Sequence, residues 1–140
     1  MDFDGIAVLD LFAGFGSLGF EALSRGACSI SFVDQHVDAL KAMKATALQL
    51  GVQHAVTIVN ADVLAFFGRA TTSQFDLIFC DPPYSWSDYE GLIERIFGGN
   101  LLAKEGFLLI EHSTQVDLSA SPSYSFHKDY GMTRVTFFQQ

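Results

Sequence analysis

The sequence predicts a doubly wound α/β fold, in which a mostly parallel sheet of seven strands carries helices on both faces. Short apolar runs, each the length of a buried strand, alternate with longer segments that have the pattern of helices. The run at residues 77–80 stops at once at an acid, two prolines and a tyrosine, as expected where a strand reaches the ligand-binding edge of an open α/β sheet. Two strand-like runs near the C-terminus, 124–129 and 133–138, have no helix between them, which indicates an antiparallel hairpin at one edge.

The predicted elements follow one another without a repeat, a low-complexity segment or a linker, which indicates a single domain over residues 1–140. The predicted strands are residues 6–11, 28–33, 55–59, 75–80, 106–110, 124–129 and 133–138. The predicted helices run from a glycine-rich turn to Gly26, over residues 36–50, over a short stretch that ends near Phe67, and over about 87–97. Ser87 begins the Ser-x-x-Glu pattern of a capping box, and residues 69–74 form a polar loop.

The composition indicates a large apolar core and an acidic surface. Hydrophobic residues make up 49% of the chain, yet no apolar run approaches the roughly 20 residues of a transmembrane helix, and no signal peptide follows Met1. Cys28 and Cys80 lie in or beside predicted buried strands, so we expect reduced core residues of a cytoplasmic protein. The histidines show no ligand spacing, and no metal site is predicted. The net charge of −8 disfavours unaided binding to nucleic acid, because phosphate contacts need Lys and Arg.

A glycine-rich turn, Gly14-x-Gly16-x-x-Gly19, follows the first predicted strand and opens a helix, so its backbone can approach a ligand. Two ligands compete for this pattern. A dinucleotide would place its pyrophosphate there, but the intervening segment Asp10–Ala13, which includes Phe12, brings a carboxylate beside the turn. A carboxylate repels a pyrophosphate and attracts a cation. The pattern therefore favours S-adenosylmethionine, which carries an ammonium and a sulfonium and no phosphate.

An acid stands at the end of each of the first four predicted strands, namely Asp10, Asp34, Asp62 and Asp81. Asp34 can accept hydrogen bonds from both ribose hydroxyls, and Asp62, with the backbone of Val63, can bind the adenine amino group. Each of these two acids is equally well explained as a helix N-cap. The set of four favours a ligand over four separate structural roles.

The segment Asp81–Tyr84 is predicted to form a stiff arch, because each proline fixes its own φ and restricts the residue before it. Asp81 and the carbonyl of Pro82 can accept hydrogens from an amino group on a nucleobase, which helps its delocalised lone pair to attack a methyl group. Pro83 stiffens the arch, and Tyr84 can stack on the target ring. Phe12, Phe15 and Trp86 are candidate walls of the site, although for the two phenylalanines a place in the core is expected. The alternative for the arch is a rigid turn without a function.

These residues resemble the bacterial RsmD-like family of methyltransferases. The resemblance is carried by Leu9–Ala27, Phe75–Ile78, Asp81–Tyr84 and Tyr130–Val135, and it covers nearly the whole chain. It implies a Rossmann-like class I methyltransferase fold that transfers a methyl group from S-adenosylmethionine to the exocyclic amino group of a guanine in small-subunit (16S) ribosomal RNA. It also implies catalysis at Asp81–Tyr84. The implied cofactor contacts are Asp10, Gly14, Gly16, Asp34 and Asp62, to which we add Phe12, Ala13, Val63 and Asp81 as candidates.

Three features depart from the family pattern. Relatives carry a basic N-terminal segment that helps to grip RNA and cover the cofactor, whereas this chain begins almost at its first strand. Thr46 replaces the usual Asn, and the net charge is −8. We therefore expect ribosomal RNA or a small-subunit assembly intermediate as substrate, with a partner or a further segment supplying basic surface.

Other functions remain open at this point. One is methylation of adenine or cytosine amino groups in DNA, or of an amide, although Asp rather than Asn at position 81 favours guanine. Another is a non-catalytic domain that binds S-adenosylmethionine. A dehydrogenase that uses a nicotinamide cofactor is a more distant alternative.

Overall fold

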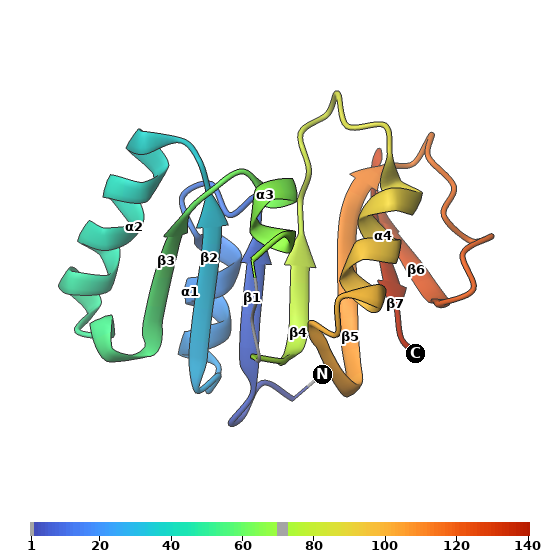
Figure 1. Ribbon diagram of the computed structural model, residues 1–140. Coiled ribbons are helices and arrows are strands. Elements are labelled where there is room, and N and C mark those ends of the chain that lie inside the picture. The colour runs from blue at the N-terminus through green and yellow to red at the C-terminus, as the bar shows by residue number, and fades with distance from the viewer. Residues whose placement is uncertain (1, 70–72) are drawn as a thin grey trace.

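The computed structural model describes residues 2–69 and 73–140, and these form one sheet with helices on both faces (Figure 1). The strands are β1 (Ala7–Leu11), β2 (Ser29–Asp34), β3 (Val56–Asn60), β4 (Phe75–Cys80), β5 (Leu102–Ser113), β6 (Tyr124–Tyr130) and β7 (Thr133–Phe138). The helices are α1 (Ser17–Ser24), α2 (Val37–Leu50), a short 3-10 helix (Gln53–Ala55), α3 (Val63–Phe67) and α4 (Tyr89–Gly98). Residues 70–72 of the predicted polar loop lie outside the described residues. In the described part of the chain, no helix has the length and apolar character needed to cross a membrane.

The strand order is β3-β2-β1-β4-β5-β7-β6, which confirms the predicted doubly wound sheet of seven strands. The strands β1 to β5 pair with one another in parallel, and β7 pairs antiparallel with both β5 and β6, as predicted for the terminal hairpin. The order of the strands reverses between β1 and β4, whose carboxyl ends are adjacent. In open α/β sheets ligands bind at this reversal. The fold therefore places the glycine-rich turn and the predicted arch side by side.

Each face of the sheet has its own hydrophobic core. Helices α1 and α2 cover one face and contribute Ala22, Leu40 and Met43 to a core built on Val8, Phe32 and Leu77. Helices α3 and α4 cover the other face, where the buried side chains of Val63, Leu92 and Ile96 pack on Leu9, Ile78 and Ile110. Strand β4 is buried on both faces from Leu77 to Cys80, as its apolar run predicts.

Three local predictions were wrong. Strand β5 runs from Leu102 to Ser113, well beyond the predicted 106–110, because its pairing with β7 continues the ladder to Ser113. The N-cap of α4 is Asp88, whose carboxylate accepts a hydrogen bond from the N–H of Gly91 at 2.9 Å, so Ser87 starts no capping box. Cys28 is exposed, because it precedes β2 in the turn after α1, whereas Cys80 is buried as predicted.

Candidate active site

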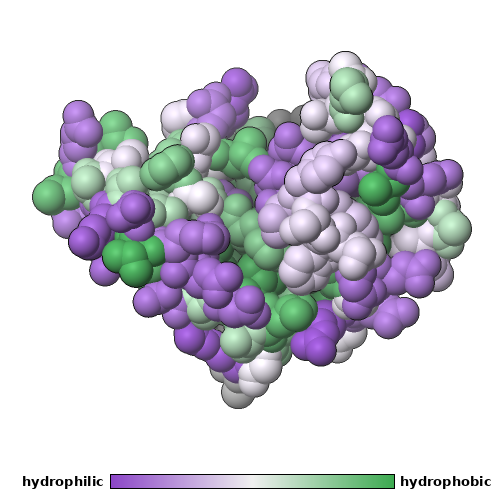
Figure 2. Space-filling model, turned by 90° about the horizontal axis from the view of Figure 1, so that it is seen from above, coloured by the Kyte–Doolittle hydropathy of each residue, from purple (hydrophilic) through white to green (hydrophobic). Residues whose placement is uncertain are grey.

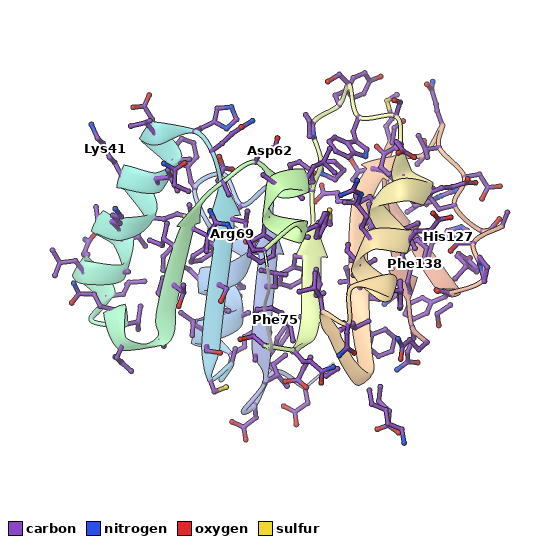
Figure 3. All side chains as sticks on the ribbon, in the orientation of Figure 1. Lys41, Asp62, Arg69, Phe75, His127 and Phe138 are labelled. Carbon is purple, nitrogen blue, oxygen red and sulfur yellow. The ribbon has the colours of Figure 1, made fainter. Side chains whose placement is uncertain are left out.

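The carboxyl ends of the parallel strands meet at one edge of the sheet, and the arch stands above this edge (Figure 1). Figure 2 looks down on it and shows weakly hydrophilic and hydrophobic surface between strongly hydrophilic patches. The acidic residues from the ends of the strands gather here, and Figure 3 labels one of them, Asp62, at the start of α3. Candidate cofactor and catalytic residues are thus brought to the same edge, as the sequence predicts.

The glycines of the turn between β1 and α1 serve two purposes. Gly14 and Gly16 have φ of 58° and 83°, in the left-handed region, and the N–H of Gly14 donates to Asp34 Oδ2 at 2.8 Å. Gly19 lies in α1 against β2, where a Cβ would overlap the ring of Phe32. The first two glycines therefore shape the turn, and the third lets the helix pack closely on the sheet. Helix α1 starts without a side-chain cap from its N-cap residue, Gly16, and the N–H of Gly19 in its first turn is directed at the carboxyl of Asp10.

Phe12 adopts an unusual backbone conformation at the start of this turn. Its φ of 58° lies in the left-handed region, which is rare for a bulky residue. Its ring is half-buried and meets Trp86 edge to face with a centroid distance of 5.2 Å. Phe15 is 68% exposed, so the expectation that it belongs to the core was wrong. It lies in the solvent-facing part of the turn, where no element can cover it.

Asp34 is the last residue of β2 and ties the turn to the start of α2. Its Oδ1 accepts hydrogen bonds from the N–H of His36 at 2.8 Å and from the His36 ring at 2.9 Å, and Oδ2 accepts from Gly14. Burial acts to raise the pKa of Asp34, but the hydrogen bonds from His36 and Gly14 outweigh it and hold the pKa below its usual value. Because three acceptor positions are used, the ionised carboxylate keeps room for one further donor.

Asp62 follows β3 and is the N-cap of α3. Its Oδ1 accepts hydrogen bonds from the N–H groups of Leu64 at 2.9 Å and Ala65 at 3.2 Å. The alternative role as a helix N-cap is therefore present in the structure. It leaves Oδ2 free of these bonds, and the N–H of Val63, in the first turn, has no acceptor within the helix. Both groups that we predicted to bind an adenine therefore remain compatible with that role.

Asp10 lies within β1, one residue before its end, and is only 2% exposed. Its Oδ2 is buried without a hydrogen-bond partner among the described residues. Burial, and then the charges of Asp81 and Asp34, raise its pKa to about 8, although the N–H of Gly19 acts in the opposite direction. A buried carboxyl with an unpaired oxygen fits a nearby cationic group, which would favour its ionised form.

The arch follows β4 as predicted. The N–H of Asp81 donates to the carbonyl of Leu11 at 3.5 Å, and the N–H of Trp86 donates to the carbonyl of Pro83 at 2.8 Å, which closes the turn. Pro82 is buried, whereas Tyr84 is 91% exposed and available for stacking. Partial burial, and then the charge of Glu111, raise the pKa of Asp81 to about 6.

A cleft of about 470 Å³ opens beside the arch, between it and the start of β7. Asp81, Tyr84, Trp86, Glu111, His112 and Met132 are among the residues that line it. Both ring nitrogens of His112 are engaged, Nδ1 with the carbonyl of Ser113 at 2.9 Å and Nε2 with Thr136 Oγ1 at 2.7 Å. Burial lowers the pKa of His112, so the ring is neutral at physiological pH. The cleft is large enough for a nucleobase.

A family model described as "Conserved hypothetical protein 95" matches residues 1–139. The chain belongs to this family. A relative from Bacillus subtilis, named "Putative rRNA methyltransferase YlbH", is 34% identical over 99% of this chain and 78% of its own length. The Escherichia coli K12 protein named "Ribosomal RNA small subunit methyltransferase D" is 28% identical over 92% of this chain and 65% of its own length. These relatives confirm the RsmD-like resemblance.

A solved structure agrees with this assignment. The crystal structure of a "putative methylase" from Haemophilus influenzae superposes with a TM-score of 0.87 and 26% identity, over 98% of this chain and 88% of that chain. The fold of this RsmD-like chain is therefore the Rossmann-like methyltransferase fold. The chain spans less than two thirds of the length of several relatives named Ribosomal RNA small subunit methyltransferase D, 62% in one case and 65% in another.

The structure of this RsmD-like chain brings the predicted residues to one edge but gives them different surroundings. Asp10 is buried in a strand, Asp34 and Asp62 cap backbone N–H groups, and Asp81 faces the cleft. Glu111 is not among the residues predicted for the site, although it lines the cleft beside Asp81. The signal was available, since Glu111 directly follows a buried apolar run, as Asp81 does.

Proposed function

We propose that this RsmD-like chain transfers a methyl group from S-adenosylmethionine to the exocyclic amino group, N2, of a guanine in small-subunit ribosomal RNA. The observation that carries the proposal is the position of Asp81. Asp81 is the first residue of the arch, at the point where the strand order reverses, and its carboxylate faces a cleft of about 470 Å³. It also lies close enough to buried Asp10 for the charges of the two residues to interact. The names of the family relatives support ribosomal RNA as the substrate.

The acidic groups at the edge support a cationic cofactor. Bound S-adenosylmethionine supplies an electrophilic methyl group on a sulfonium. Asp10 would face its positive charge, the backbone of Ala13, Gly14 and Gly16 would enclose it, Asp34 would accept from the ribose, and Asp62 with Val63 would accept and donate at the adenine. Phe12 would form a wall. The pyrophosphate of a nicotinamide dinucleotide would instead meet the carboxyl group of Asp10 beside the turn, which argues against the dehydrogenase.

The arch can activate an amino group without a covalent intermediate. The ionised Asp81 and the carbonyl of Pro82 would accept the amino hydrogens, which draws the nitrogen lone pair out of conjugation and stabilises the positive charge that develops. Pro82 and Pro83 hold these acceptors in a fixed geometry, so little ordering is needed when the base arrives. Tyr84 is exposed at the arch and would stack on the extruded base.

The acidic surface bears on how the RNA is held. With a net charge of −8, the residues of this chain supply little of the cationic surface that phosphate contacts require. We propose that a partner on the small-subunit assembly intermediate, or a further protein segment, provides it in the cytoplasm. The domain over residues 1–140 would then supply the cofactor site and the arch.

Calorimetric titration with S-adenosylmethionine, with NAD as control, tests the cofactor, and methyl transfer to small-subunit ribosomal RNA and its assembly intermediates tests the reaction. We expect Asp81→Ala to abolish transfer while the cofactor affinity stays nearly intact, and Asp34→Ala to weaken cofactor binding first. Asp4→Ala, an exposed carboxylate near the start of β1, is the matched control. Absence of cofactor binding, or full turnover by Asp81→Ala, would refute the proposal.

A further inference from the structure

Glu111 and Asp81 occupy equivalent positions on neighbouring strands. Cys80, the last residue of β4, pairs with Ile110 of β5 in parallel register, so Asp81 directly follows β4 where Glu111 continues β5. Because adjacent strands lie about 4.8 Å apart and equivalent residues point to the same side of the sheet, the two carboxylates stand next to each other. The charge of Glu111 contributes to the raised pKa of Asp81, which agrees with this short separation.

The cleft contains few protein groups that could donate hydrogen bonds to these two carboxylates. Both line the cleft beside the arch, and among the described residues the side chain of Glu111 has no hydrogen-bond or ion-pair partner. His112, the neighbouring residue, uses both ring nitrogens on Ser113 and Thr136. When a bound base excludes water from the cleft, these two carboxylates need hydrogen-bond donors from that base.

Trp86 supplies an independent sign of a ligand in the same cleft. Its indole lines the cleft, and its Nε1 is buried without a partner among the described residues. Indole N–H is a donor only, so it calls for an acceptor. The edge-to-face contact with Phe12 holds the ring in place. The cleft therefore offers two acceptors from Glu111 and Asp81, and one donor from Trp86.

Among the nucleobases that carry an exocyclic amino group, guanine matches this set. Its Watson–Crick edge presents the donors N2–H₂ and N1–H side by side, followed by the acceptor O6. In adenine and cytosine the ring nitrogen beside the amino group is an acceptor, which would face a carboxylate without a hydrogen between them. Leaving buried polar groups unpaired in this way discriminates strongly between otherwise similar substrates.

We propose that Glu111 is the residue that selects guanine: its carboxylate accepts N1–H of the extruded base, while Asp81 accepts a hydrogen of the N2 amino group and Trp86 donates to O6. This inference rests on the proposed function and names the residue that determines its base specificity. It assigns Glu111 to substrate binding and leaves Asp81 as the group that activates the nitrogen.

The test compares guanosine with 2-aminopurine riboside, which keeps the amino group but has an acceptor at N1. The nucleotide that the wild-type protein methylates is first mapped in small-subunit ribosomal RNA by mass spectrometry. An RNA fragment around it is then synthesised with either base at that position, and kcat/KM is measured for both. In Glu111→Gln the side-chain amide can donate to N1 of 2-aminopurine, whereas its neutral carbonyl is a weaker acceptor for N1–H of guanine than the carboxylate.

We expect Glu111→Gln to lower kcat/KM for guanosine, and to lower the preference for guanosine over 2-aminopurine, each by about 10- to 100-fold. The affinity for S-adenosylmethionine and the unfolding midpoint should not change. Glu105→Gln, the same substitution near the opposite end of β5, should leave the preference at its wild-type value. The intrinsic reactivities of the two amino groups cancel when variants are compared.

The outcomes separate the two proposals. If the wild-type protein methylates the guanosine fragment and Glu111→Gln keeps the wild-type preference, the role of Glu111 is overturned and the proposed function stands. If the wild-type protein transfers no methyl group to any guanine of the ribosomal RNA or its assembly intermediates, the proposed function fails, and the role of Glu111 fails with it.

Discussion

Replacing Asp10 by Asn should stabilise the free protein at alkaline pH and much less at acidic pH. Asp10 is 2% exposed, its Oδ2 has no partner among the described residues, and its pKa is raised from 3.8 to about 8. For an acid whose pKa is higher in the folded state, the stability it contributes is complete below the unfolded pKa and is lost as pH rises through the folded pKa. Asparagine has nearly the same shape and does not ionise.

The magnitude follows from the size of the shift. One pKa unit corresponds to about 1.4 kcal/mol, so the folded state loses about 3 to 4 kcal/mol of stability through Asp10 between pH 5 and pH 8. This is a large part of the ~5–15 kcal/mol that a domain typically has. The difference in the free energy of unfolding between Asp10→Asn and wild type should therefore grow by about 3 to 4 kcal/mol over that interval.

Urea denaturation of both proteins at pH 5 and pH 8, followed by circular dichroism, measures this difference. Other titrating groups affect both proteins alike and cancel in the comparison. Asp4→Asn, at an exposed position, should show no pH-dependent difference from wild type. If the stability difference for Asp10→Asn changed by less than about 1 kcal/mol between the two pH values, the carboxyl of Asp10 would not be buried in the way the structure shows.

Three further predictions follow from the site. At pH 7, binding of S-adenosylmethionine should release up to about one proton from wild type and none from Asp10→Asn, measured by calorimetry in buffers of different ionisation enthalpy. Gly19→Ala should lower the free energy of unfolding by about 1 to 2 kcal/mol, because its Cβ would overlap Phe32 and the higher helix propensity of Ala offsets only part of the cost of this overlap. Urea denaturation measures the change, and a variant more stable than wild type would contradict the prediction. The rate of methyl transfer should fall as pH drops through about 6, because Asp81 must be ionised. In Glu111→Gln the midpoint of the pH-rate profile should lie at lower pH, and an unchanged midpoint would exclude the charge interaction between Glu111 and Asp81.

The parts of the fold that depend on local sequence could be predicted. The run ending at Cys80, the two prolines and the turn at Gly131 each restrict the backbone directly, and the structure places β4, the arch and the hairpin accordingly. The length of β5 could not be read in the same way, because its last residues are held by pairing with β7, about 25 residues further along the chain. Exposed Cys28 and Phe15 show the same limit: apolar character predicts burial only where another element covers the side chain.

The candidate site shows the same difference between features set by local sequence and features set by contacts between distant segments. The acids could be found by their places after apolar runs, but their surroundings depend on contacts between elements. Asp10 is buried because β2, β4 and α1 surround it, and Asp34 is held by the turn 20 residues before it. The apolar run before Glu111 marks the end of a strand, but its place beside Asp81 depends on the register of β4 against β5, which no local pattern records.

The distribution of charge explains why this edge suits one cofactor and one kind of base. Asp10, Asp34, Asp81 and Glu111 bring four carboxyl groups together, and the pKa values of Asp10 and Asp81 are raised because burial, and then the neighbouring negative charges, disfavour their ionised forms. Ligands that relieve this repulsion must bring positive charge or rows of N–H donors, and a sulfonium with an ammonium does the first while the guanine edge does the second. An RNA phosphate does neither. The same carboxylates repel phosphate, so under the proposed function we expect the basic surface that holds the RNA backbone to lie away from this edge, on the proposed partner or further segment.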